Sequence, residues 1–436
     1  MRNLKIAVAV TAALAAGSAS AYDPTTGTAP FVASVVAGSS ALRNGFANEM
    51  KNTFCAGAAD YSTFISSSSD FRAYSCTLTS TASVPTTLRN QTAIVYYRSE
   101  GGSFVGVGPL ALSQQVKRLK IDSNCVKATT NTVAPFAYTC PVSGYVYASD
   151  TGTGNLVNDT VELGISDEEP AALVGENLPD LTNSPFDTSA LDVSTITPNQ
   201  VLAQGFAVAV NTSGDAGVAA VTNLSSASIN AILQGTYSNW NQVPKADNSG
   251  FVTANNVPIT VCRRDVGSGT QTMASIFFYG VTCNSSAGAF GAPNNVVNNS
   301  TGALVTCLQN HNNSIGYLAW NNTLTNAQYI SIDGVAPTLQ GFAAGTYKFG
   351  STAYFNNPGA YTVSANDALL FGAIIKTAST PSKLPAIGGT AGLGNNLTGL
   401  IGVNGQVKAN AVPFASATPV ASWNNGGNSC SPIVAQ

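Results

Sequence analysis

Residues 264–270 read Arg-Asp-Val-Gly-Ser-Gly-Thr and join one apolar run to the next. Residues 257–261 before this stretch predict a buried strand, and residues 271–278 after it predict a helix. The first N–H groups of a helix have no intrahelical partner and lie at the positive end of its dipole, so they can bind an anion. Arg264 adds a fixed charge and a two-pronged donor. This stretch therefore predicts an oxyanion site on a strand–turn–helix unit, although alone such a turn is more often a plain helix N-cap.

The rest of the chain repeats the alternation of strand and helix. Residues 31–37, 93–97 and 205–210 are β-rich, whereas residues 41–54 and 226–233 have helical character. This order predicts an α/β fold with ligand sites at the carboxyl ends of the strands. About four hundred residues are more than one core usually supports, so we expect two domains.

The first residues are typical of a cleavable secretory signal. Arg2 and Lys5 precede an apolar run at residues 6–16, and residues 19–21 are Ala-Ser-Ala. We therefore expect a signal peptide over residues 1–21 and a soluble mature protein, in the periplasm or secreted. No cysteine follows the cleavage site to carry a lipid, and no later run has the length and apolarity to span a bilayer.

Eight cysteines in an exported chain predict disulfides. Pairing of nearest neighbours joins Cys55 to Cys76 and Cys125 to Cys140. The remaining four cysteines then share two bridges in an order that the sequence leaves open: Cys262, Cys283, Cys307 and Cys430. Zinc is the weaker interpretation, because there is no Cys-x-x-Cys motif and only one histidine, His311. We expect no metal and no cofactor.

The charge of the chain restricts its partners. Without Arg2 and Lys5, 16 basic and 21 acidic side chains remain, which gives a net charge of about −5. This charge argues against nucleic acid and anionic membranes as partners. It still allows a small anion, because helix amides and one arginine act at short range.

Three further segments have the same character as residues 264–270. Gly38-Ser39-Ser40 follows the first strand, residues 98–102 (Arg-Ser-Glu-Gly-Gly) follow another, and residues 163–167 (Leu-Gly-Ile-Ser-Asp) end an apolar run. In this order the four segments resemble turns of the phosphate-binding proteins of bacterial ABC phosphate transporters. Residues 224–241 and 314–317 resemble scaffold segments of the same family, so the resemblance covers roughly residues 31–320. It implies a two-lobed periplasmic-binding-protein-like fold of type 2, with the ligand between the lobes.

The resemblance also implies a ligand set. Arg264 pairs with the anion, and Asp167 accepts a hydrogen bond from a protonated phosphate and rejects fully ionised sulfate. Hydroxyls and backbone amides complete the set, from Ser40, Ala41, Ser99, Ser268, Gly269 and Thr270. Without the resemblance, Asp167 fits a helix N-cap equally well, and Ser99 is a plain turn residue.

Two positions depart from the family pattern. Val266 stands where the family has an aspartate, with Asp265 displaced by one position. Glu100 replaces a small polar residue, and it would repel phosphate if it faced the site but matter little if it faced solvent.

The resemblance and the composition together give a domain scheme. Lobe 1 covers residues 22–200, with an insertion at about 104–160, and lobe 2 covers residues 201–350. Residues 351–436 return to lobe 1 and end in an extension rich in Gly and Asn. Residues 176–200 are expected to form an exposed link or lid.

We therefore expect an exported, monomeric solute-binding protein that holds phosphate or a related tetrahedral oxyanion and delivers it to an ABC transporter permease. The alternative is a secreted surface or matrix protein that reuses the scaffold without a ligand. We expect no enzyme and assign no catalytic residue, because no histidine is placed to act as a base for Ser268.

Overall fold

The computed structural model describes residues 23–67, 70–129, 136–279, 291–338, 341–342, 345–380 and 383, together with the short segments 400–403, 420–421, 423–424 and 434–435. The expected signal peptide, Cys283, Cys430 and most of the C-terminal extension lie outside these residues. No helix in the described part of the chain has the length and apolarity needed to cross a membrane.

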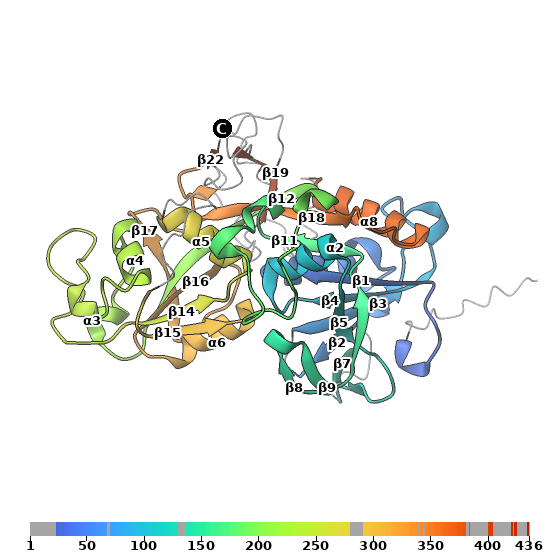
Figure 1. Cartoon of the computed structure of the whole chain (residues 1–436), viewed down its shortest axis with the longest axis horizontal. Coiled ribbons are helices and arrows are strands. Elements are labelled where there is room, and N and C mark those ends of the chain that lie inside the picture. The colour runs from blue at the N-terminus through green and yellow to red at the C-terminus, as the bar shows by residue number, and fades with distance from the viewer. Residues whose placement is uncertain are drawn as a thin grey trace, which may run out of the picture.

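One long mixed sheet connects two lobes (Figure 1). Its strands run in the order β15-β14-β16-β12-β18-β11-β1-β4-β3-β2-β7-β6. We call the part built on β1, β4 and β11 lobe 1, and the part built on β14, β15 and β16 lobe 2. The long strand β12 (Ile196–Asn211) pairs with β18 (Gly350–Pro358) through its first half and with β16 through its second half, so it belongs to both lobes.

Lobe 1 is centred on β1, which lies parallel to β4 and β11. Val36 of β1 packs on one face of the sheet, while Val35 and Ala37 pack on the other, as the twofold side-chain alternation of a strand requires. Helices α1 and α8 supply residues to the first of these clusters, and α2 supplies Leu110 to the second. The elements are β1 (Val32–Gly38), β2 (Ser62–Ser66), β3 (Phe71–Thr77), β4 (Thr92–Arg98), β11 (Leu163–Ser166), α1 (Arg43–Glu49), α2 (Gly108–Leu112) and α8 (Ala365–Ala378).

Lobe 2 has three parallel strands, with β14 between β15 and β16. Helices α4 and α5 contribute to a large apolar cluster around Trp240, and α6 contributes Leu304 and Leu308 to a smaller one. The elements are β13 (Asn223–Leu224), β14 (Thr260–Arg264), β15 (Asn295–Asn298), β16 (Ser314–Ala319), β17 (Ala327–Ile332), α3 (Ala216–Ala219), α4 (Ser226–Leu233), α5 (Gly269–Tyr279) and α6 (Thr301–Asn310).

The remaining strands form small sheets and edges. Those between α2 and β11 are β5 (Gln115–Leu119), β6 (Val126–Lys127), β7 (Ala137–Cys140), β8 (Val142–Val146), β9 (Thr151–Gly154) and β10 (Leu156–Thr160). Near the C-terminus, β19 (Leu400–Val403) pairs with β12, β20 (Val420–Ala421) pairs with β19, and β21 (Trp423–Asn424) pairs with β22 (Val434–Ala435).

The observed elements agree with the predicted alternation and differ at some boundaries. The predicted strand at residues 257–261 is wrong by three residues, because β14 starts at Thr260 and Arg264 is its last residue. The helix predicted over residues 41–54 starts at Arg43 and ends in a π-helical turn at Met50–Phe54. The predicted strand at residues 205–210 is only the end of β12.

Two segments can be compared with their predicted character. Residues 102–112 fold into a short 3-10 turn and α2 against the strand ends of lobe 1, and the first strand after them begins at Gln115. Residues 176–200 are only partly exposed, because Phe186 is buried beside Phe104 and β12 already begins at Ile196.

Three disulfides lie among the described residues. The predicted Cys55–Cys76 and Cys125–Cys140 bridges are confirmed, and Cys262 pairs with Cys307. His311 lies beside the third bridge, with Nδ1 2.9 Å from the carbonyl oxygen of Cys307. The side chains of Cys262, Cys307 and His311 lie together, but the two cysteines are joined in one disulfide and offer no thiolate to a metal ion.

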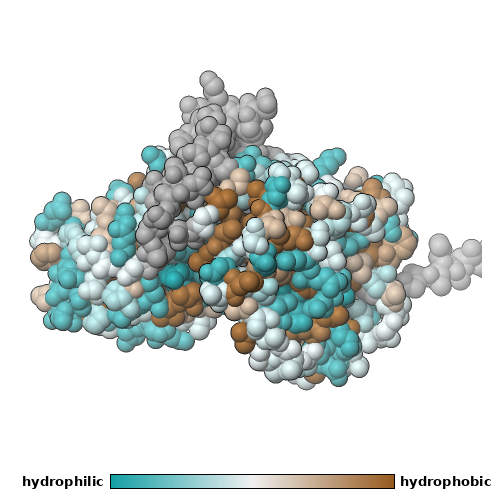
Figure 2. Space-filling model, in the orientation of Figure 1, coloured by the Kyte–Doolittle hydropathy of each residue, from teal (hydrophilic) through white to brown (hydrophobic). Residues whose placement is uncertain are grey.

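Most of the face seen in Figure 2 is polar or neutral, and its most prominent hydrophobic area lies near the middle, over the junction of the two lobes.

Candidate functional site

Five strand ends converge where the lobes meet. The parallel strands β1, β4 and β11 end at Gly38, Arg98 and Ser166, and on the opposite side β14 and β15 end at Arg264 and Asn298. The carboxyl ends of parallel strands lie at one edge of a sheet, so both lobes direct their following turns toward the same place. All four turns singled out in the sequence are in this region.

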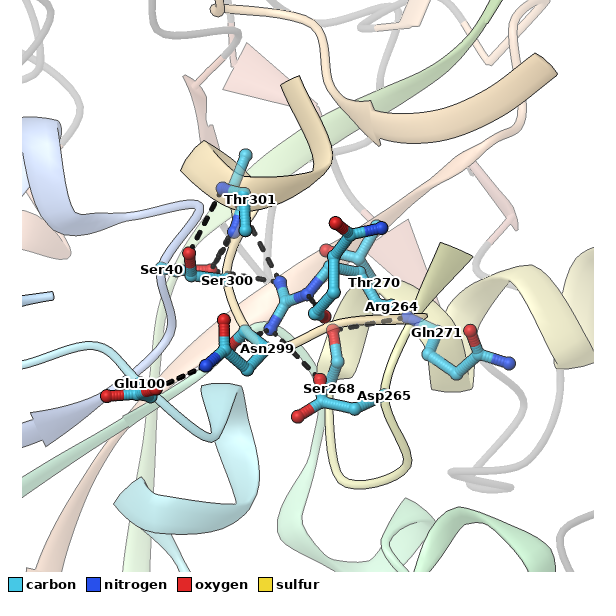
Figure 3. A network of polar contacts seen from close by, with 12 residues as sticks. Ser40, Glu100, Arg264, Asp265, Ser268, Thr270, Gln271, Asn299, Ser300 and Thr301 are labelled. Carbon is cyan, nitrogen blue, oxygen red and sulfur yellow. Dashed lines mark hydrogen bonds and ion pairs between the residues drawn. The ribbon is translucent and has the colours of Figure 1, made fainter. Parts of the chain in front are cut away.

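Arg264 is the centre of the polar network (Figure 3). It is 1 % exposed, and its Nε donates to the carbonyl of Asn298 at 3.0 Å. Its Nη1 donates to the Ser40 hydroxyl of lobe 1 at 2.9 Å and to the Thr301 hydroxyl at 3.4 Å. Its Nη2 lies 3.4 Å from the Asp265 carboxylate and 3.1 Å from the carbonyl of Asn299. The fork is therefore held in one orientation, with protein oxygens around every nitrogen.

The start of helix α6 belongs to the site, although the sequence reasoning missed it. Ser300 caps the helix by accepting from the Ala303 amide at 3.2 Å. The Thr301 amide donates to the Ser40 hydroxyl at 3.1 Å, and the two hydroxyls lie 2.8 Å apart. A capping serine before an apolar helix was visible in the sequence at Ser300, but nothing there showed that α6 begins beside Arg264.

Asp167 is 2 % exposed and faces both lobes. One carboxyl oxygen accepts a hydrogen bond from Ser39, and the other lies 3.5 Å from the Thr270 hydroxyl of lobe 2. Burial raises the pKa of this carboxyl to about 6, against the opposing effects of Ser39, Arg264 and Thr270. Its contacts cross between the lobes, which a simple helix N-cap would not require.

Glu100 is buried rather than solvated. One carboxyl oxygen accepts from the Asn299 side chain of lobe 2, and the other has no hydrogen-bond partner among the described residues. Burial, reinforced by the negative charge of Asp70, raises its pKa to about 8. A neutral Glu100 puts no charge against an anion, so the expected repulsion is absent at pH values below about 8.

Ser99 lies near the network without contacting Arg264. Its hydroxyl lies 3.3 Å from the carbonyl of Asp70 and accepts from Arg43 at 3.2 Å. Arg43 also pairs with the Asp70 carboxylate at 3.4 Å. This arrangement brings a second buried arginine to the junction, a residue that the sequence reasoning did not select.

The start of helix α5 holds the remaining predicted residues. The Ser268 hydroxyl accepts from the Gln271 amide at a long 3.5 Å, and Ser268 packs against Gly102 of lobe 1. Gly269 is the first residue of the helix and lies against Ser103, Asp167 and Glu168. Ala41, predicted as an amide donor, packs its side chain into the main cluster of lobe 2.

The lobes contact each other directly across the site. The Phe104 amide donates to the Gly267 carbonyl at 2.8 Å, and the Gly101 amide donates to the Asn299 carbonyl at 3.3 Å. Together with the contacts of Ser40 and Asp167, these bonds describe a closed arrangement. A cavity of about 580 Å³ lies elsewhere, along α8 beside Leu369 and Lys376.

Comparison with known proteins agrees with this architecture. The family model of the PBP superfamily domain matches residues 147–370, just over half of the chain. The chain therefore belongs to the PBP superfamily, and its mixed α/β fold is that of the type 2 periplasmic binding proteins. A search of curated proteins gave no match.

Similar solved structures include a phosphate-binding protein from Stenotrophomonas maltophilia and an ABC-type phosphate transport receptor from Vibrio cholerae. The first is 14% identical, covers 80% of this chain and 84% of its own, and has a TM-score of 0.42. The second is 18% identical, covers 52% of this chain and 77% of its own, and has a TM-score of 0.34. These identities and TM-scores are too low to transfer a ligand, so phosphate binding is stated here only of those two proteins.

Proposed function

We propose that this chain is an exported solute-binding protein that holds phosphate, or a related tetrahedral oxyanion, between its two lobes. The observation that carries the proposal is the position of Arg264. It is a buried cation at the end of β14, set between the starts of α5 and α6 and in contact with the Ser40 hydroxyl of the opposite lobe. A buried cation with converging helix starts and hydroxyls is suited to a compact anion.

Binding would replace contacts that the protein makes with itself. The outer nitrogens of Arg264 donate to Ser40, Thr301 and Asn299 in the closed arrangement. An oxyanion between the lobes would take over part of this fork, and the hydroxyls of Ser40 and Thr301 would turn to donate to it. The amides of Gly269 and Thr270 would supply further donors from the start of α5.

Asp167 would provide selectivity. Its carboxyl already accepts from hydroxyl donors on both lobes, namely Ser39 and Thr270. A protonated phosphate oxygen is a donor of the same kind, whereas sulfate at neutral pH has no proton to offer. The site would therefore accept phosphate and leave sulfate facing an uncompensated carboxylate.

A second function is favoured by one observation. Protein oxygens surround the fork of Arg264, and the Glu100–Asn299 pair links the two lobes directly. A surface or matrix protein that has kept the scaffold and lost the ligand would hold its lobes together by such direct contacts.

Calorimetric titration of the anion-stripped protein with phosphate and then with sulfate separates the two functions. Micromolar or tighter binding of phosphate alone supports the solute-binding function. Such binding should also raise the melting temperature, because the ligand binds only the folded chain. No heat and no thermal shift with either anion would favour the matrix protein.

The same proposal includes a monomeric protein in the periplasm or outside the cell, with an ABC transporter permease as its partner. Size-exclusion chromatography with light scattering tests the first point, and fractionation of expressing cells tests the second.

A further inference from the structure

Glu168 is a buried carboxyl that the proposed function does not yet use. Its side chain is 1 % exposed, and no well-aligned hydrogen bond reaches either carboxyl oxygen among the described residues, although the Ser103 hydroxyl lies close enough to lower its pKa. The backbone beside it is fixed, because its carbonyl accepts from the Ser166 hydroxyl at 2.7 Å. A buried carboxyl without a good hydrogen bond lowers the stability of the folded protein, unless a ligand or a proton compensates for it.

The carboxyl lies against the start of helix α5. Its Oε2 is 1.8 Å from the point that a Cβ on Gly269 would occupy, and the Ser103 hydroxyl is 2.5 Å from the same point. The 11-residue helix thus begins with a glycine that leaves room for an acidic side chain of the other lobe.

The amides at this helix start are also without acceptors. Within the described part of the chain, the N–H groups of Gly269 and Thr270 donate to no protein oxygen, and the ladder of the helix begins with the Thr272 amide on the Ser268 carbonyl at 2.9 Å. Both residues are buried. Two buried donors without an acceptor and one buried carboxyl without a well-aligned hydrogen bond therefore lie side by side.

The surroundings of Glu168 favour its neutral form. Burial raises its pKa well above the usual range, and the negative charge of Asp167 raises it further, while the nearby Ser103 lowers it in part. The other charged groups at the junction are Glu100 from the β4 turn, Arg264 and Asp265 from the β14 end, and the Arg43–Asp70 pair of lobe 1. A neutral carboxyl has one O–H group to donate.

We propose that Glu168, as a neutral acid, is a further binding residue that donates its O–H to an oxyanion held by the amides of Gly269 and Thr270. An anion at this point would satisfy all the unpaired groups at once. The inference rests on the proposed function and adds to it a loss of affinity when Glu168 ionises.

The test compares two variants with the unmodified chain, each titrated calorimetrically with inorganic phosphate at pH 6 and at pH 9. Glu168→Gln keeps the size and a donor without the ability to ionise, and Glu168→Ala removes the donor. Phosphate and Glu100 also titrate in this range and are common to all three proteins. Asp167 is coupled to Glu168, so its ionisation is followed in each protein by its own carboxyl ¹³C resonance when Kd values at one pH are compared. Circular dichroism and melting temperature confirm that each variant is folded.

The expected result at pH 6 is a Glu168→Gln affinity close to that of the unmodified chain and a loss of about tenfold for Glu168→Ala, the size of one hydrogen bond to a charged group. Where the carboxyl ¹³C resonance shows that Glu168 is ionised, the unmodified chain should bind about tenfold more weakly than Glu168→Gln. Tighter binding by Glu168→Ala at pH 6 would overturn the inference, because the carboxyl would then compete with the ligand.

Equal Kd values for all three proteins at both pH values would overturn it as well, while leaving the proposed function in place. Absence of binding by the unmodified chain would overturn the proposed function and this inference together. As a readout independent of affinity, the carboxyl ¹³C resonance of Glu168 should titrate well above the ordinary range of a glutamate, and titration near that ordinary value would contradict the neutral form.

Discussion

At the scale of single residues, Arg264 is the group on which anion binding depends most. Its five contacts come from the β14 end, the β15–α6 turn and the opposite lobe, so the guanidinium geometry matters as much as its charge. Arg264→Lys should keep the charge, lose the fork and weaken phosphate binding by at least tenfold, and Arg264→Ala should abolish it. Calorimetry measures both effects, and circular dichroism reports whether the variants are folded. Full affinity in Arg264→Ala would place the site elsewhere.

Asp167 gives a prediction about selectivity. Asp167→Asn replaces an acceptor by an amide that can also donate, so sulfate no longer faces a carboxylate. The ratio of the sulfate Kd to the phosphate Kd, measured at pH 7, should fall by tenfold or more. An unchanged ratio would mean that Asp167 serves only to hold Ser39 and Thr270 in place.

Glu100 gives a prediction about stability. Its pKa is about 8 in the folded protein against 4.5 in the unfolded chain, so the folded state keeps a proton that the unfolded state releases between these values. Its contribution to the free energy of unfolding is therefore fully present below pH 4.5 and falls as the pH rises toward 8. Glu100→Gln removes this loss and should stabilise the protein at pH 9, by up to a few kcal/mol, since one pKa unit corresponds to about 1.4 kcal/mol.

Urea unfolding at pH 5 and pH 9 measures this difference. The exposed Asp247, whose pKa is lowered by Ser249, provides the control, because Asp247→Asn should not stabilise the protein at pH 9. A Glu100→Gln variant that is no more stable than the unmodified chain at pH 9 would show that Glu100 is ionised at little cost.

At the scale of elements, the two helix starts at the junction differ in how much room they leave. A Cβ at Gly269 would lie 1.8 Å from Glu168 Oε2 and 2.7 Å from Asp167 Cβ, whereas one at Gly302 in α6 would meet nothing nearer than 3.9 Å. Gly269→Ala should therefore hold the lobes apart and weaken phosphate binding at least tenfold. The matched variant Gly302→Ala should keep affinity and add roughly 0.5–1 kcal/mol of stability, as alanine does in a helix. Equal affinities would show that α5 does not close onto Glu168.

The elements also show what the sequence could and could not predict. Local patterns sufficed for α4, whose observed bounds are the predicted ones, and for β1 and β4 to within one residue at each end. The start of β14 was predicted too early. Residues 257–259 have strand character in the sequence, but Pro258 forms only an isolated bridge, and β14 begins at Thr260.

The candidate site was predictable only where a motif carried its own chemistry. Arg264 was selected from its own turn, whereas Ser40 and Asp167 were selected through the family resemblance, and all three lie at the junction. Ser39, Glu168 and Thr301 were missed, because their importance depends on which turns meet across the two lobes. That meeting is set by strands far apart in the chain, such as β11 against β18.

At the scale of the whole molecule, the contacts between lobes should control opening. The Asn299 side chain donates to Glu100, so Asn299→Asp would set two carboxyls against each other. Above pH 8 this variant should have a larger radius of gyration by small-angle X-ray scattering and weaker phosphate binding. The exposed Asn312→Asp adds the same charge away from the junction and should change neither quantity. Identical scattering from both variants would mean that the lobes are held together by other contacts.

The shared strand β12 also has a consequence for biosynthesis. The sheet of lobe 1 is complete only when β18, at residues 350–358, pairs with β11 and β12. A ribosome must therefore make more than three quarters of the chain before its first half can finish folding. Such long-range pairing is slow to form, and the early strands stay open to chaperones and to wrong partners in the meantime.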